Sequence, residues 1–69
     1  MENSNKFIEV KDKLVGSILI NISTIENIYY DGLMTVYYQL DNGTTKDEVF
    51  EFRDDAKQRY KYLCNTLSI

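Results

Sequence analysis

The stretch TVYYQLDNGTTKDEVFEF, residues 35–52, decides the fold of this chain. Val, Thr and Tyr fit a pleated, half-buried surface, so residues 33–40 predict one strand and residues 44–52 predict another. The segment DNG at 41–43 lies between them and has the residues that tight turns favour. The pattern therefore predicts an antiparallel hairpin with aromatic residues in both strands.

The length of the loop at 41–43 sets the register of this hairpin. A three-residue loop needs Gly at its last position, and Gly43 fills it if Leu40 pairs with Thr44. Val36 then lies opposite Glu48. A two-residue Asn-Gly loop would instead shift the register by one residue and move the side chains of the second strand, including Phe50, to the opposite face. We favour the three-residue loop because it gathers six large apolar side chains on one face: Met34, Val36, Tyr38, Leu40, Phe50 and Phe52.

Short apolar runs before this hairpin predict further strands. They cover residues 6–10, 17–22 and 26–30. A charged loop at 11–16 separates the first strand from the second, and a brief turn starting at Ser23 precedes the third. Asp31-Gly32 then predicts a tight turn into the decisive hairpin.

Residues 53–69 predict a helix, because apolar side chains recur there at helical spacing: Ala56, Tyr60, Leu63 and Leu67. Asp54 is the expected N-cap, and Asp55 lies favourably in the helix dipole. The predicted fold is therefore α+β: a curved antiparallel meander of four to five short strands, with one C-terminal helix packed on one face.

The composition narrows the class of protein. A chain of 69 residues predicts one domain over residues 1–69, in which 1–5 form a disordered tail. A domain of this size is marginally stable, and Cys64 is the only cysteine, so an intrachain disulfide is excluded. With no His, a zinc site is excluded too, and we expect no metal and no cofactor. Oligomerisation is the remaining aid to stability.

Location and nucleic-acid binding follow from charge and hydropathy. The start MENSNK has no apolar signal segment, and no apolar run approaches the ~20 residues of a membrane span. A lone cysteine fits a reducing compartment, so we expect a cytoplasmic protein without membrane contact. The net charge of −3 makes DNA binding through the phosphate backbone an unfavoured function.

The residue inventory also argues against catalysis. Without His, the common base for a Ser or Cys nucleophile is missing, and Cys64 is interpreted as a packed apolar residue. The acidic residues between 47 and 55 are interpreted as solvated surface. The same interpretation applies to three basic helix residues, Lys57, Arg59 and Lys61. We therefore expect a protein that is not an enzyme.

The second face of the sheet raises the question of function. It carries Leu33, Thr35, Tyr37, Gln39, Val49 and one of Tyr29 and Tyr30. One explanation is that the first two strands pack across this face and close a small half-barrel. The other is a tyrosine-rich platform for a second subunit or another ligand, since Tyr is favoured at interfaces. The binding residues predicted for such a platform are Tyr29, Tyr37, Leu33 and Gln39.

Two segments carry a resemblance to known families. ILINISTIENI at 18–28, followed by TVYYQLDNG at 35–43, resembles the short flagellar and swarming-motility protein family and the LytTR-type β domains of bacterial response regulators. The positions that match the motility family are Asn21, Ile25, Glu26, Ile28, Thr35, Val36, Leu40, Asn42 and Gly43, while the LytTR type shares a similar run of short strands. These are turn and core positions, so the resemblance implies a fold of short strands followed by a helix.

Two hypotheses of function follow. The first is a small non-enzymatic interaction module, self-associating as a homo-oligomer, that binds a protein partner through the tyrosine-rich face or an edge strand. The alternative is an inhibitor from a phage or mobile element, which blocks a host protein or sequesters a nucleotide ligand by stacking on tyrosines.

Overall fold

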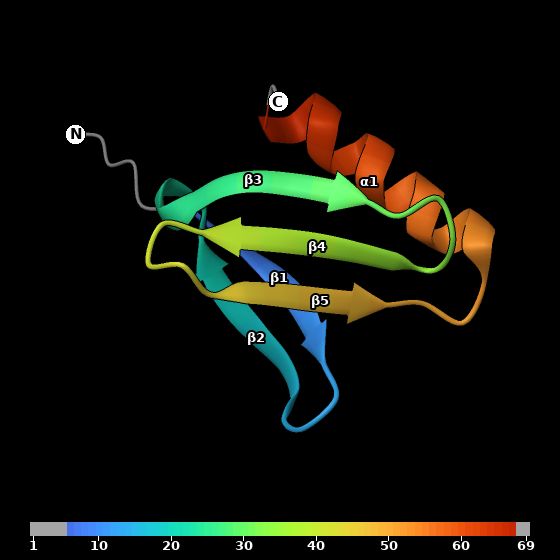
Figure 1. The fold of residues 1–69 in the computed structure, drawn as a ribbon, viewed down its shortest axis with the longest axis horizontal. Helices are drawn as coiled ribbons and strands as arrows, with labels where there is room; N and C mark the ends of the chain where they lie inside the picture. Colours follow the sequence, from blue (N-terminus) through green and yellow to red (C-terminus); the bar gives the residue numbers. More distant parts are fainter. Residues whose placement is uncertain (1–5, 68–69) are drawn as a thin grey trace.

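The computed structural model describes residues 6–67. Its element order is five strands followed by one helix, and every strand pairing is antiparallel, which confirms the predicted α+β class (Figure 1). The predicted tail 1–5 and the last two residues of the predicted helix, 68–69, lie outside the described residues. The elements are β1 (Phe7–Asp12), β2 (Gly16–Asn21), the 3-10 turn η1 (Ile22–Thr24), β3 (Ile25–Tyr30), β4 (Thr35–Leu40), β5 (Thr45–Val49) and α1 (Arg53–Leu67).

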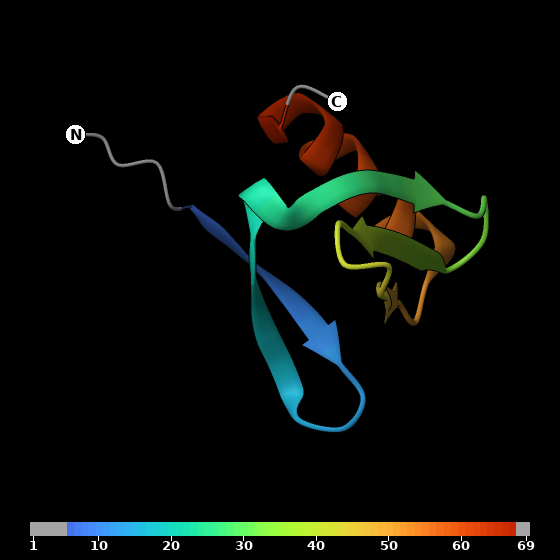
Figure 2. The ribbon, with the colours of Figure 1, turned by 60° about the vertical axis from the view of Figure 1, so that its left-hand side comes forward.

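The strands form two sheets, one of β1 and β2 and one in the order β3-β4-β5. The meander breaks at η1, where local hydrogen bonds replace ladder bonds. The side-chain Oδ1 of Asn21 accepts from the backbone N–H of Ser23 at 3.0 Å, and the hydroxyl of Thr24 donates to the carbonyl of Asn21 at 2.7 Å. These bonds turn the chain, so the β1–β2 hairpin leaves the plane of the larger sheet (Figure 2).

The β4–β5 hairpin has the predicted three-residue loop. Leu40 N–H donates to the carbonyl of Thr44 at 2.8 Å, and Gly43 has φ +89°, a conformation that favours glycine. Val36 lies opposite Glu48, as the favoured register requires. Strand β5 ends at Val49, however, three residues earlier than predicted.

The core lies between the larger sheet on one side and both α1 and the β1–β2 hairpin on the other. The buried apolar side chains come from all three units: Val10, Ile20, Ile28, Val36, Tyr38 and Leu63, with Ala56 buried nearby. Since the hairpin shares the helix side of the sheet, it does not cover the opposite face (Figure 2). The half-barrel explanation is therefore wrong.

Two predicted core residues are exposed. Met34 precedes the start of β4 and is 45% exposed, while Phe52 lies between β5 and α1 and is 62% exposed. Both lie outside the strands, where the alternation of faces no longer holds.

The helix presents the predicted apolar stripe to the core. Ala56 and Leu63 are buried, and Tyr60 and Leu67 pack partly buried against the same cluster. The helix begins at Arg53, so Asp54 lies in its first turn and is not the N-cap. Among residues 6–67, no helix combines the length and the apolar character needed to span a membrane.

Candidate binding surface

One face of the β3-β4-β5 sheet has no covering element among the described residues. We call it the open face, and define it by the eight strand residues whose side chains alternate with the core positions. In each strand these residues are exposed or half-buried, whereas their neighbours at Ile28, Val36, Tyr38 and Glu48 are buried. The open face consists of Asn27, Tyr29, Thr35, Tyr37, Gln39, Thr45, Asp47 and Val49.

A tyrosine pair lies at the centre of the open face. Tyr29 on β3 lies directly opposite Tyr37 on β4, with ring centroids 6.1 Å apart and ring planes 49° to each other. The hydroxyl of Tyr29 donates to Oε1 of Gln39 at 2.9 Å. These contacts hold the two rings in a defined arrangement and leave Tyr29 40% exposed.

Three of the four predicted binding residues thus lie together: Tyr29, Tyr37 and Gln39. The fourth, Leu33, lies in the turn between β3 and β4 and is 53% exposed. Its N–H donates to Oδ1 of Asp31 at 2.7 Å, which fixes the turn beside the open face.

Tyr30 belongs to the opposite face. It pairs with Val36, its ring stacks on Tyr60 with centroids 5.8 Å apart, and its hydroxyl donates to the carbonyl of Leu33 at 2.9 Å. The question of which tyrosine joins the open face is therefore resolved in favour of Tyr29.

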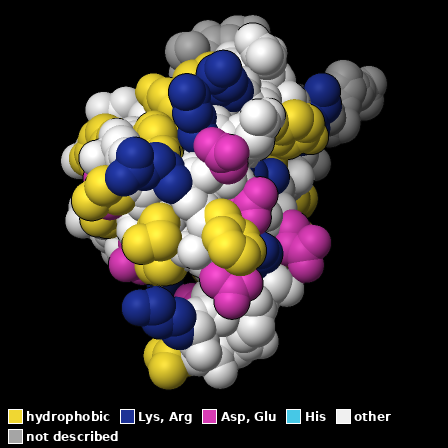
Figure 3. All heavy atoms as spheres, turned by 90° about the vertical axis from the view of Figure 1, so that its right-hand side faces the viewer, with side chains coloured by type: hydrophobic (Ala, Val, Ile, Leu, Met, Phe, Trp, Pro, Cys, Tyr) yellow, Lys and Arg dark blue, Asp and Glu magenta, His cyan; other side chains and the backbone are white. Residues whose placement is uncertain are grey.

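The end of the molecule that holds the β3–β4 turn and the β5–α1 connection also exposes apolar groups. Leu33, Met34 and Phe52 belong to these connections, and each is at least 45% exposed. Figure 3 views this end and shows hydrophobic side chains with Lys, Arg, Asp and Glu side chains between them. The exposed apolar surface is therefore interrupted by charge at this end.

A buried carboxylate joins the two sheets and the helix. Glu48 on β5 is only 3% exposed, and its Oε1 accepts from the hydroxyl of Tyr38 at 2.7 Å and from Nε of Arg59 at 3.2 Å. Its Oε2 accepts from the backbone N–H of Lys11 on β1 at 3.0 Å. Arg59 also donates from Nη2 to the carbonyl of Glu9 at 2.6 Å. We call Tyr38, Glu48 and Arg59 the Glu48 cluster.

The Glu48 cluster shifts the pKa of its members. Burial and the neighbouring Glu48 carboxylate raise the pKa of Tyr38, so its hydroxyl stays protonated and donates. Burial lowers the pKa of Arg59, but its interactions with Tyr38 and Glu48 outweigh that effect and raise it overall. Because the buried polar side-chain atoms among the described residues all have hydrogen-bond partners, the arrangement fits a structural joint.

Two interpretations from the sequence fail at this cluster. Glu48 and Arg59 were expected on solvated surfaces, yet Glu48 is buried and Arg59 lies half-buried against it. The favoured register already placed Glu48 opposite Val36 on the core face. A carboxylate on the core face requires a cationic or hydrogen-bonding partner. That requirement is the feature of the sequence that could have indicated a buried contact between Glu48 and a basic residue.

Other chemistry has little support within residues 6–67. No group of three or more His, Cys, Asp or Glu side chains there could hold a metal ion. Cys64 is half-buried in α1. Comparison with family models, curated proteins and solved structures finds no match to this chain.

Proposed function

We propose that this protein is a small non-enzymatic binding module that associates with a second copy of itself through the open face. The observation that carries the proposal is the contrast between the two faces of one sheet. Both α1 and the β1–β2 hairpin cover one face, and no described element covers the other, which has paired tyrosines at its centre.

The composition of the open face suits a protein interface. Only one of its eight residues, Asp47, is charged, and depletion of charge is typical of interface centres. Tyr29 and Tyr37 offer large amphipathic rings whose hydroxyls can be satisfied at an interface. A domain of this size also gains stability from a partner that covers a sheet face.

A second copy is the occupant that this face fits by symmetry. Two sheets can stack face to face at about 10 Å, and a two-fold axis would bring the same surface from each copy together. Tyr29 on β3 and Asp47 on β5 lie on either side of Tyr37 on the central strand β4, so Asp47 is at one edge of the sheet. Its carboxylate can therefore remain at a solvated rim, where burial does not penalise it.

The nucleotide-sequestering alternative has less support. None of the eight open-face residues is Lys or Arg, the side chains that usually neutralise phosphate groups. The two rings also contact each other at a tilt of 49°. A protein surface needs no counter-charge for phosphate, so self-association is the better fit.

Tyr37→Glu tests the proposal. It places a carboxylate beside Tyr29 and opposite Asp47, in a site that the dimer would desolvate, so the mass should fall to that of the monomer. Like charges on opposed strand residues cost only about 0.2–1 kcal/mol, so the circular dichroism spectrum should keep its β signal. Gln58→Glu is the matched control, since it adds the same charge at an exposed helix position and should leave the mass unchanged. Equal masses for wild type and Tyr37→Glu would contradict the proposal.

A further inference from the structure

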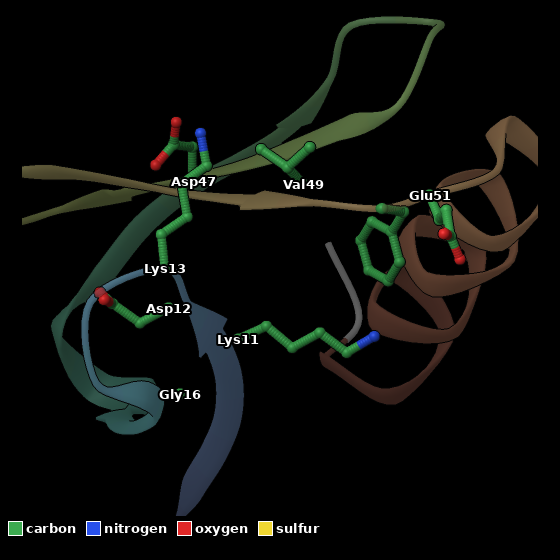
Figure 4. Close-up of a pocket in the computed structure, with 8 residues that line it drawn as sticks. Lys11, Asp12, Lys13, Gly16, Asp47, Val49 and Glu51 are labelled. Carbon is green, nitrogen blue, oxygen red and sulfur yellow. The ribbon is translucent and has the colours of Figure 1, made fainter.

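An open cleft separates the β1–β2 hairpin from β5. It has a volume of ≈ 490 Å³, and Figure 4 shows side chains from both walls reaching into it. From the hairpin, Lys11 extends toward Phe50, with its Nζ 5.0 Å from the ring centroid. Lys13 extends toward Asp47 on β5 (Figure 4). The cleft therefore combines the Phe50 ring with charges of both signs, which are Lys11 and Lys13 from the hairpin and Asp47 and Glu51 from the opposite wall.

Strand β5 presents an unpaired backbone edge along this cleft. It is the last strand in the order β3-β4-β5, and its bonds to β4 use the even-numbered residues. The N–H of Leu40 donates to the carbonyl of Thr44, and the N–H of Phe50 donates to the carbonyl of Met34. In an antiparallel ladder the intervening residues then point their N–H and C=O groups outward. On β5 these are Thr45, Asp47 and Val49, and all three are exposed.

Two other strand edges are already occupied or blunted. On β1, the outward carbonyl of Glu9 accepts from Arg59, and the outward N–H of Lys11 donates to Glu48. Strand β3 has a register shift between Ile25 and Asn27, a device that hinders further pairing. No comparable device appears along the described edge of β5, so its edge can accept a further strand.

The charge of this edge selects the occupant. If β5 paired with β5 of a second copy about Asp47, the two Asp47 carboxylates would lie opposite each other, and like charges in that position are destabilising. A basic residue opposite Asp47 is favourable by the same rule. The net charge of −3 also attracts basic segments over a longer range.

We infer that the free edge of β5 binds an extended segment of a partner protein in which basic and apolar residues alternate. The segment adds one strand to the β3-β4-β5 sheet. Its basic residues lie beside Asp47 on the open-face side, and its apolar residues point into the cleft toward Phe50. Main-chain hydrogen bonds supply the affinity, and the alternation of side chains supplies the specificity.

The inference rests on the proposed role as a binding module, but it uses the strand edge instead of the tyrosine pair. The monomeric variant Tyr37→Glu should therefore still bind the segment. If self-association fails as a hypothesis, this edge can still be tested on its own.

A short synthetic peptide of alternating Lys and Val, about six residues long like an average strand, is the probe. Amide hydrogen exchange measured by NMR should show new protection at the outward N–H groups of Asp47 and Val49. A matched peptide with N-methyl groups on alternate amides keeps the charge but loses ladder bonds, and should bind about tenfold more weakly.

Charge reversal gives the second arm of the experiment. Asp47→Lys should weaken binding of the Lys–Val peptide about fivefold and should create binding of the corresponding Glu–Val peptide. The inference is overturned if the methylated peptide binds equally well, or if the two outward amides stay unprotected. It is also overturned if they become protected without peptide as protein concentration rises, since a second copy would then occupy the edge.

Discussion

At the scale of single residues, Glu48 has the most consequence for stability. A carboxylate that is 3% exposed persists because three donors reach it, from Tyr38, Arg59 and the N–H of Lys11. These contacts connect β4, α1 and β1 at one point, and the bond from Arg59 to the carbonyl of Glu9 joins α1 to β1 beside it. Glu48 therefore helps to hold the β1–β2 hairpin against the sheet, together with the apolar contacts of Val10 and Ile20.

Glu48→Ala tests that role. It leaves the half-buried Arg59 guanidinium and the Tyr38 hydroxyl without their acceptor, so the free energy of unfolding should fall by about 3–5 kcal/mol. Asp47→Ala, at the next position but exposed, should change it by less than about 0.5 kcal/mol. Urea denaturation measures both. Similar values for the two variants would show that Glu48 is not a structural joint.

The Tyr38 hydroxyl predicts a dependence of stability on alkaline pH. Burial and Glu48 raise its pKa above the ordinary value of 10.0, so the folded protein holds a proton that the unfolded chain releases near that pH. The stabilisation is complete below pH 10 and declines as pH rises above 10. Tyr38→Phe should remove this decline. Equal pH dependence above 10 in the two proteins would contradict the assignment.

At the scale of elements, the predictions agree with the structure wherever nearby residues determine the conformation. The DNG loop required a left-handed glycine, and Gly43 has φ +89°. The helix stripe followed from spacing alone, and Ala56 and Leu63 are fully buried. Period and turn chemistry are local properties, so a single sequence reveals them.

The predictions that differ from the structure concern features that depend on contacts between distant parts of the chain. The side of the sheet on which the β1–β2 hairpin packs is set by Val10, Ile20 and the Glu48 cluster, which meet only after folding. The position of Arg59 along the helix is similarly compatible with exposure to solvent and with contact to a buried carboxylate. No local pattern distinguishes these outcomes, because each depends on long-range packing.

The assignment of β4 and β5 side chains to the two faces of the sheet can be tested by truncating one valine on each face. Val36 is fully buried on the core face, and Val49, on the adjacent strand, is 43% exposed on the open face. Val36→Ala should lower the free energy of unfolding by about 1–3 kcal/mol, whereas Val49→Ala should lower it much less in the monomeric Tyr37→Glu background. Thermal melts measure both. Equal losses would contradict the assignment of the two faces.

At the scale of the whole molecule, two elements of the described fold pack on one side of its larger sheet, and none packs on the other side. The hairpin and α1 share the core face of the sheet (Figure 1). The tyrosine pair lies on the face that neither of them reaches. A chain of 69 residues buries a modest core, so a second copy that covers this face would add stability as well as function.

The most direct test of self-association is the mass of the wild-type protein, measured in solution over a wide dilution series. Sedimentation equilibrium or light scattering should give twice the monomer mass of 8.1 kDa at high concentration and approach the monomer mass on dilution, as mass action requires. A wild-type protein that has the monomer mass at every concentration would contradict self-association through the open face.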